Sequence, residues 1–117
     1  MYPQFEAVKQ NMENMIKFSK SEYTKYKSTK NIVYLQQSGE KLFNALESYI
    51  EFINKIQVSS YYELKNLIKE KSLRNLLYDA RNLHRFFYSA ELEMNKEDAE
   101  ELYLNVRSRL EKRIERI

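Results

Sequence analysis

Apolar positions recur at intervals of three and four residues along most of the chain, which is the period of an α-helix with one buried face. On this basis we predict helices at about residues 3–27, 32–57, 61–70, 73–94 and 96–116. Short connections between neighbouring helices favour antiparallel packing. The sequence therefore predicts an all-α fold, an antiparallel up-and-down bundle of four to five helices, in a single domain over residues 1–117.

The second predicted helix carries the clearest buried stripe. Its members are Leu35, Gly39, Leu42, Leu46, Tyr49, Ile53 and Ile56. Gly39 is the only glycine of the chain, and a glycine inside a helix costs about 1 kcal/mol relative to alanine. We therefore expect the backbone of another helix to approach closely at Gly39.

Polar residues that can cap a helix precede four of the predicted helices. The candidates are Ser28 or Asn31 for the second helix, Ser59 or Ser60 for the third, Ser72 for the fourth and Asn95 for the fifth. Ser60 and Glu63 also have the spacing of a capping box.

Composition supports long helices and excludes several kinds of site. One Gly and one Pro in 117 residues leave little material for turns. The absence of Cys excludes disulfides and Cys-zinc sites, and a single His excludes a multi-histidine metal site, so we expect no metal and no cofactor. No apolar run is long enough to span a membrane, and the first residues do not resemble a signal peptide. We expect a cytoplasmic protein with no membrane partner.

Charge is distributed unevenly, although the net charge is only +3. Residues 65–85 hold six Lys or Arg and two acids, whereas residues 89–101 hold six acids and one Lys. The basic segment overlaps the stretch "RNLLYDARNLHRFFY", residues 74–88. At about 100° per residue, its three arginines fall within roughly 40° of one another, with two tyrosines and the only histidine on the same side of the helix. These residues are Arg74, Tyr78, Arg81, His84, Arg85 and Tyr88.

This combination suits a ligand rich in phosphate, because guanidinium groups bind phosphate, aromatic faces stack and an imidazole donates a proton. The predicted nucleotide- or RNA-binding residues are Arg74, Arg81, His84, Arg85 and Tyr88. The same pattern is also typical of a solvated helix edge, with arginine stems laid over the core. The helical wheel leaves both interpretations open.

Two segments carry a family resemblance. They are "YLQQSGEKLFNALESYIEF" (34–52) and "LLYDARNLHRFFYSAELEMNKEDAEELYLNVRSRLEKRI" (76–114). Together they resemble the HEPN superfamily of small helical bundles. The second segment is similar to the archaeal branch named for paralogous repeats in Pyrobaculum, in which an A-x-x-L-H-x-x-F-Y helix precedes an acidic turn and a final helix. Here that motif consists of Ala80, Leu83, His84, Phe87 and Tyr88.

The resemblance implies an RNA-related role. Many HEPN members are RNases, or toxins paired with a nucleotidyltransferase antitoxin, whose Arg and His, four to six residues apart, meet at a dimer interface. Here Arg74 and Asn75 match the start of that motif, but Asp79 stands where the His is expected, and Arg81 and His84 are separated by only two residues. We therefore expect a homodimeric HEPN-like module without an intact nuclease motif.

The resemblance also implies partners. Such a module would bind RNA or a nucleotide, or belong to a toxin–antitoxin pair with a nucleotidyltransferase-type protein. One alternative is an atypical metal-independent RNase that uses Arg81 and His84 as its catalytic pair. Another is a purely structural or adaptor bundle that binds a protein partner through exposed apolar residues such as Phe86 and Tyr62. Phe86 is the candidate subunit contact, and packing of Phe86 within the chain is the competing interpretation.

Overall fold

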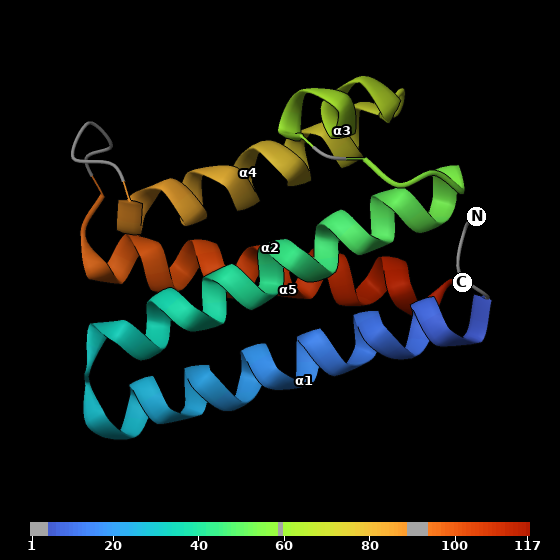
Figure 1. The fold of residues 1–117 in the computed structure, drawn as a ribbon. Coiled ribbons are helices and arrows are strands. Elements are labelled where there is room, and N and C mark those ends of the chain that lie inside the picture. The colour runs from blue at the N-terminus through green and yellow to red at the C-terminus, as the bar shows by residue number, and fades with distance from the viewer. Residues whose placement is uncertain (1–4, 59, 89–93) are drawn as a thin grey trace.

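The computed structural model describes residues 5–58, 60–88 and 94–117, and in these residues the chain is helical with no strand (Figure 1). The helices are α1 (Phe5–Thr29), α2 (Ile32–Asn54), α3 (Tyr61–Leu67), α4 (Lys71–Tyr88) and α5 (Lys96–Glu115). The predicted all-α bundle of four long helices and one short helix is confirmed. Within the described ranges, no helix is long and apolar enough to cross a membrane.

The four long helices pack in chain order. Helices α1 and α2 form an extensive hairpin, α2 packs against α4, and α4 packs against α5. Helix α5 returns beside α1, so that the start of α1 and the end of α5 lie at the same end of the bundle (Figure 1). The short helix α3 packs against α2 and leads into α4, and its first residue, Tyr61, contacts Arg81 of α4 (Figure 1).

The buried stripe of α2 differs from the prediction at its C-terminal end. Ile53 and Ile56 are 43% and 46% exposed, whereas Ala45 and Ile50 are fully buried. The predicted stripe followed a spacing close to 3.5 residues, and a straight helix turns once every 3.6 residues, so the buried side drifts away from a near-heptad pattern. The helix also ends at Asn54, because Lys55 takes a left-handed conformation (φ 54°, ψ 40°) that stops it.

Three of the predicted caps are confirmed. The side chains of Asn31, Ser60 and Asn95 accept hydrogen bonds from the backbone N–H groups that begin α2, α3 and α5. The prediction for Ser72 is wrong. Helix α4 begins at Lys71, two residues before the predicted start, so that Ser72 lies inside the helix, and the Ser72 hydroxyl instead hydrogen-bonds the carboxylate of Glu70.

The fourth helix, predicted over about residues 73–94, is described as far as Tyr88. Residues 89–93 lie outside the described part of the chain. Met94 lies just before α5 and packs against the core rather than continuing α4.

The close approach expected at Gly39 occurs between α1 and α2. Ser19, Ser38 and Gly39 are all buried where these two helices meet, and the Ser19 hydroxyl donates to the backbone carbonyl of Ser38 at 2.7 Å. Such a bond from side chain to opposing backbone requires small residues on both helices. The helix-propensity cost of Gly39 is therefore offset by tight packing of the hairpin.

A network of polar side chains then joins this hairpin to α5. The Ser19 oxygen lies 2.6 Å from the hydroxyl of Tyr103, which is fully buried. Because the single Ser19 proton is already donated to Ser38, the Tyr103 hydroxyl must be the donor in this contact. Tyr23 stacks on Tyr103 with ring centroids 5.0 Å apart and donates to Glu100 at 2.6 Å. We call Ser19, Tyr23, Glu100 and Tyr103 the tyrosine network.

Candidate functional site: an exposed arginine and tyrosine face

Helix α4 buries one side and presents the opposite flank to solvent. The buried residues are Leu73, Leu76, Leu77, Ala80 and Leu83. Arg74 and Arg81 are exposed, and Tyr78, which lies between them on the same flank, is 61% exposed. This stripe of cation, ring and cation remains available to a ligand because the contacts that hold α4 in the bundle are made by other sides of the helix.

Helix α3 extends this surface. Ser60 caps α3, and its first residue, Tyr61, lies with its ring centroid 4.0 Å from the Arg81 guanidinium carbon. The neighbouring Tyr62 is 77% exposed. A guanidinium stacked on a ring keeps its edge N–H groups free to bind phosphate, and the stacking holds it in place. We call Arg74, Tyr78 and Arg81 of α4, together with Tyr61 and its neighbour in sequence Tyr62 on α3, the arginine–tyrosine face.

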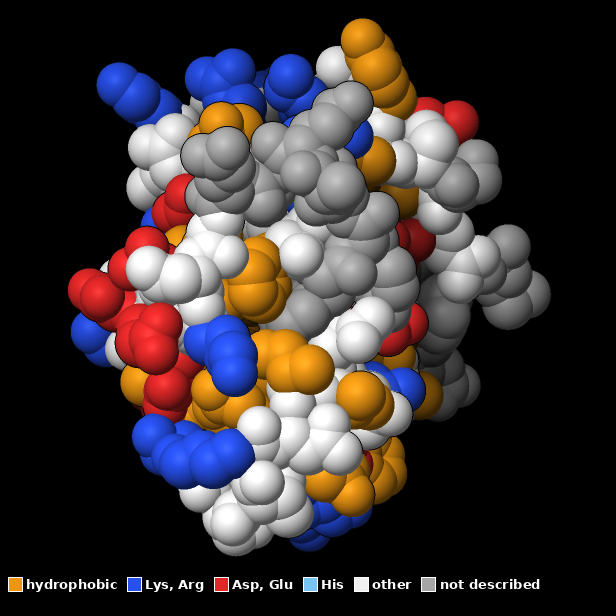
Figure 2. All heavy atoms as spheres, turned by 90° about the vertical axis from the view of Figure 1, so that its left-hand side faces the viewer, with side chains coloured by type: hydrophobic (Ala, Val, Ile, Leu, Met, Phe, Trp, Pro, Cys, Tyr) orange, Lys and Arg blue, Asp and Glu red, His pale blue; other side chains and the backbone are white. Residues whose placement is uncertain are grey.

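The arginines of α4 also differ from most others in their charge partners. No ion pair between described residues includes Arg74, Arg81 or Arg85. Figure 2, which views the end of the bundle at the left of Figure 1, shows Lys and Arg side chains along the top, where α3 and α4 lie, and Asp and Glu toward the left, where α5 begins. Basic and acidic side chains are therefore separated on the surface of the protein, as they are along the sequence.

His84 occupies a different environment from the arginines. It is half-buried, and its ring stacks on Phe43 of α2, with centroids 5.3 Å apart and planes at 21°. Arg81, by contrast, packs on α3. The two residues of the alternative catalytic pair therefore pack against different helices, and the ring of His84 is turned toward the bundle.

The other two predicted RNA-binding residues, Arg85 and Tyr88, lie at the C-terminal end of α4. Arg85 is half-buried near the end of α4. Tyr88 is the last residue of α4, and its side chain lies outside the described part of the structure.

Asp79, which stands where the resembling family has its histidine, has a structural partner. Its carboxylate pairs with the Arg109 guanidinium at 2.5 Å, and both side chains are about one-third exposed. This pair links α4 to α5. The position is therefore occupied by an ion pair between helices rather than by a group facing the arginine–tyrosine face.

Phe86 packs within the chain. It is half-buried against the hydrophobic core. This agrees with the competing interpretation of Phe86 as an intrachain contact, and its role as a subunit contact stays a prediction.

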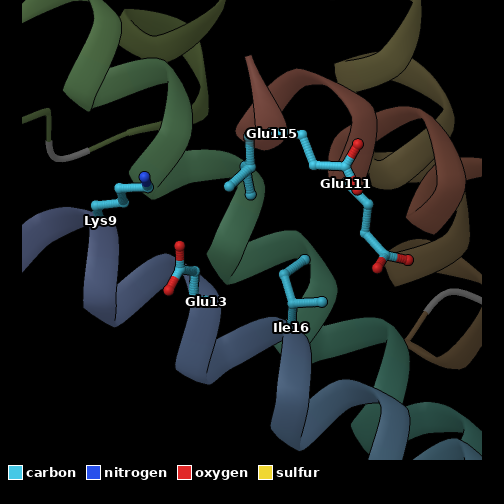
Figure 3. Close-up of a pocket in the computed structure, with 6 residues that line it drawn as sticks. Lys9, Glu13, Ile16, Glu111 and Glu115 are labelled. Carbon is cyan, nitrogen blue, oxygen red and sulfur yellow. The ribbon is translucent and has the colours of Figure 1, made fainter. Parts of the chain in front are cut away.

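A separate groove lies between α1 and α5, with a volume of about 220 Å³. Lys9, Glu13 and Ile16 of α1 face Glu111 and Glu115 of α5 across it (Figure 3). Although three carboxylates line the groove, they are not close enough together to form a metal site, and the described residues contain no group of three or more metal-ligating side chains elsewhere.

Sequence reasoning missed the role of Tyr61. A wheel of α4 alone cannot show which residues of another helix lie beside it, and the spacing of a single helix gave no sign that α3 would fold over Arg81. The exposure of Tyr62, in contrast, was anticipated.

Comparison of the chain with protein families, curated proteins and solved structures found no match.

Proposed function

We propose that this chain is an RNA-binding helical module, resembling HEPN domains without an intact nuclease motif, and that its arginine–tyrosine face binds single-stranded RNA. The observation that carries the proposal is the exposed Tyr78 between two exposed arginines that have no ion-pair partner among the described residues. Surface arginines in a merely solvated edge need no exposed aromatic ring between them.

The chemistry of this face fits a single-stranded polynucleotide. A base that stacks on a tyrosine contributes about 1–3 kcal/mol, and every base has a face that can stack. Arg74 and Arg81 then supply charged donors to the phosphates on either side of the base. Tyr62 offers a second ring, on α3, for a neighbouring base.

Binding without cleavage is favoured over the RNase alternative. A general acid or base must lie within hydrogen-bond reach of the atom it serves. The half-buried His84 ring, stacked on Phe43, is turned away from the exposed rings and arginines that would hold RNA. If labelled RNA is nevertheless degraded by the purified protein and His84→Ala abolishes the degradation, the RNase alternative is correct.

The proposal is tested by fluorescence anisotropy with a labelled oligouridylate of about 12 nucleotides, a length within the range of known single-strand sites. We expect Arg74→Gln/Arg81→Gln to bind about tenfold more weakly, with the slope of log K against log salt reduced by about 1.4 because two phosphate contacts are lost. Lys17→Gln/Lys41→Gln removes the same charge from exposed positions of α1 and α2 and serves as the matched control. Equal weakening in both variants would contradict the proposal.

The homodimer and the nucleotidyltransferase-type partner are implied by the family resemblance alone. Light scattering coupled to size-exclusion chromatography tests the first of these. A homodimer would have twice the 14.3 kDa mass of one chain. A monomer that binds RNA would leave the binding proposal intact and remove the dimer from it.

A further inference from the structure

A second basic surface lies where the first turns of α4 meet the last turns of α5. A hollow of about 440 Å³ opens here. Four cationic side chains line it, three from α5 and one from its C-cap residue, at spacings of three and four residues that place them on one side of the helix. They are Arg109, Lys112, Arg113 and Arg116. Ser72 and Asn75 of α4 add neutral hydrogen-bonding groups.

Two of these cations are held in place by carboxylates. Arg109 pairs with Asp79, and Arg113 donates to Glu70 at 3.0 Å and to the Ser72 hydroxyl at 2.7 Å. Hydrogen bonding to Glu70 is the main reason that the pKa of Arg113 is raised above its ordinary value. These contacts fix the walls of the hollow and neutralise about half of its positive charge.

The other two cations have no carboxylate in direct contact, although the charge of Arg116 helps to lower the pKa of Glu70 in the wall of the hollow. Lys112 and Arg116 are exposed, lie four residues apart and have no ion-pair partner in the described part of the chain. The hollow therefore carries an excess of positive charge at one rim, beside walls that are already positioned. An anion with several oxygens would satisfy these groups better than water does.

The hollow also adjoins the arginine–tyrosine face. Consecutive residues of α4 belong to the two surfaces, because Arg74 lies on the face and Asn75 lines the hollow. A chain of phosphates that leaves the face at Arg74 would reach the hollow by passing around the first turns of α4.

We propose that this hollow is a second phosphate-binding site, with Lys112 and Arg116 as its binding residues and the Asn75 amide as a neutral donor, while Ser72 donates to Glu70 and accepts from Arg113 in the wall of the hollow. The phosphate belongs either to the backbone of RNA bound on the arginine–tyrosine face or to a free polyphosphate. An RNA backbone as the source of the phosphate depends on the RNA-binding function proposed above. The existence of the phosphate site does not depend on it.

A purely structural role makes a different prediction. Basic residues in the last turn of a helix favour the negative end of its dipole and stabilise the fold. In that case Lys112→Gln/Arg116→Gln would lower the thermal midpoint and leave phosphate binding unchanged. Because both side chains are exposed, we expect this variant to fold.

The first experiment uses inorganic tripolyphosphate and amide NMR spectra of the labelled full chain. We expect shifts concentrated in residues 70–76 and 109–116, and about tenfold weaker binding in Lys112→Gln/Arg116→Gln. Lys17→Gln/Lys41→Gln is again the matched control. The proposed phosphate site would be contradicted if no shifts occurred in these two segments. It would also be contradicted if Lys112→Gln/Arg116→Gln bound tripolyphosphate as tightly as the control variant.

The second experiment identifies the source of the phosphate. We expect Lys112→Gln/Arg116→Gln to weaken binding of an oligouridylate of about 12 nucleotides and to leave one of about 4 nucleotides unaffected, since the short one fits on the arginine–tyrosine face. If tripolyphosphate binds and RNA of either length does not, the site stands and the RNA-binding function fails. If the long RNA binds both proteins equally, the hollow takes free polyphosphate and the backbone source is overturned.

Discussion

The arginines of α4 and α5 share a chemistry but differ in their surroundings. In α5, Arg107, Arg109 and Arg113 each pair with a carboxylate. In α4, Arg74 and Arg81 are exposed and pair with none of the described carboxylates. The pairs of Arg109 and Arg113 hold α5 to α4 and to Glu70 just before it, and Arg107 pairs within α5, whereas exposed arginines beside exposed rings are free to meet a ligand.

The tyrosines show the same division. Tyr103 is fully buried, and it donates to Ser19 within the tyrosine network. Tyr78 is mostly exposed and lies on the arginine–tyrosine face. Substitutions in the network should therefore change stability, and substitutions on the face should change binding.

The largest expected effect is on the stability of the bundle when Tyr103 is truncated. We expect Tyr103→Ala to lower the free energy of unfolding by about 4 kcal/mol, since it removes a fully buried ring and leaves a cavity. Tyr78→Ala, the matched truncation on α4, should cost less than about 0.5 kcal/mol. Urea unfolding measures both. If the two variants lost similar amounts of unfolding free energy, Tyr78 would have a packing role. The distinction between the buried tyrosine network and the exposed arginine–tyrosine face would then be wrong.

Within the network, the direction of the hydrogen bonds predicts the next effect. Ser19→Ala leaves the buried Tyr103 hydroxyl without its acceptor, which should cost about 2 kcal/mol. Tyr103→Phe removes only a donor to an oxygen that keeps its bond to Ser38, and should cost about 1 kcal/mol. Urea unfolding of the two variants checks the order. A larger loss in Tyr103→Phe would reverse the assigned direction, and Ser21→Ala on the exposed side of α1 serves as the control.

The network also predicts how stability depends on pH. Hydrogen bonds from Lys27 and Tyr23 hold the pKa of Glu100 below its ordinary value of 4.5. A group whose pKa is lowered by folding stabilises the fold above its unfolded pKa, and this contribution disappears as the pH falls through the folded pKa. We therefore expect the thermal midpoint of unfolding to decrease when the pH is lowered below about 4.5. The decrease should be less steep in Glu100→Gln.

At alkaline pH, the pKa shifts and their effect on stability have the opposite sign. Burial is the main reason that the pKa values of Tyr23 and Tyr103 are raised above the ordinary value of 10.0. Their contribution is present below about pH 10 and is lost as the pH rises, because the unfolded chain ionises first. The same series of thermal midpoints, continued above pH 10, should fall in the wild type. A midpoint that stays constant from acid to alkaline pH would contradict the network as described.

The smallest expected effect concerns Asp79. Because this carboxylate and Arg109 are each about one-third exposed, Asp79→Asn should lower the free energy of unfolding by only about 0.5 kcal/mol. RNA affinity should not fall. A marked loss of RNA binding without loss of stability would show that Asp79 acts on the ligand rather than on the contact between α4 and α5.

The sequence predicted the helices well because their stripes and caps are local properties. Leu73 to Leu83 of α4 and the caps Asn31, Ser60 and Asn95 follow from spacing and side-chain type. The ends of the helices were less predictable. Lys55 ends α2 in a conformation that glycine usually adopts, so no sequence signal marked it.

The site was predictable only in part. The wheel correctly grouped Arg74, Tyr78 and Arg81 on one flank of α4, since that grouping depends on one helix. It could not show that Tyr61 would stack on Arg81, that His84 would turn toward Phe43, or that Asp79 would meet Arg109. Each of these contacts joins residues that are distant in sequence, and helical spacing carries no information about them.

The most direct test of the central claim is to map where RNA touches the protein. A single-stranded RNA that carries 4-thiouridine can be cross-linked by light to the purified wild-type chain, and mass spectrometry then identifies the modified residues. The arginine–tyrosine face predicts cross-links at Tyr78 and Tyr62, and their loss in Arg74→Gln/Arg81→Gln. Cross-links confined to other exposed rings, such as Phe18 on α1, or no cross-link at all, would contradict the account.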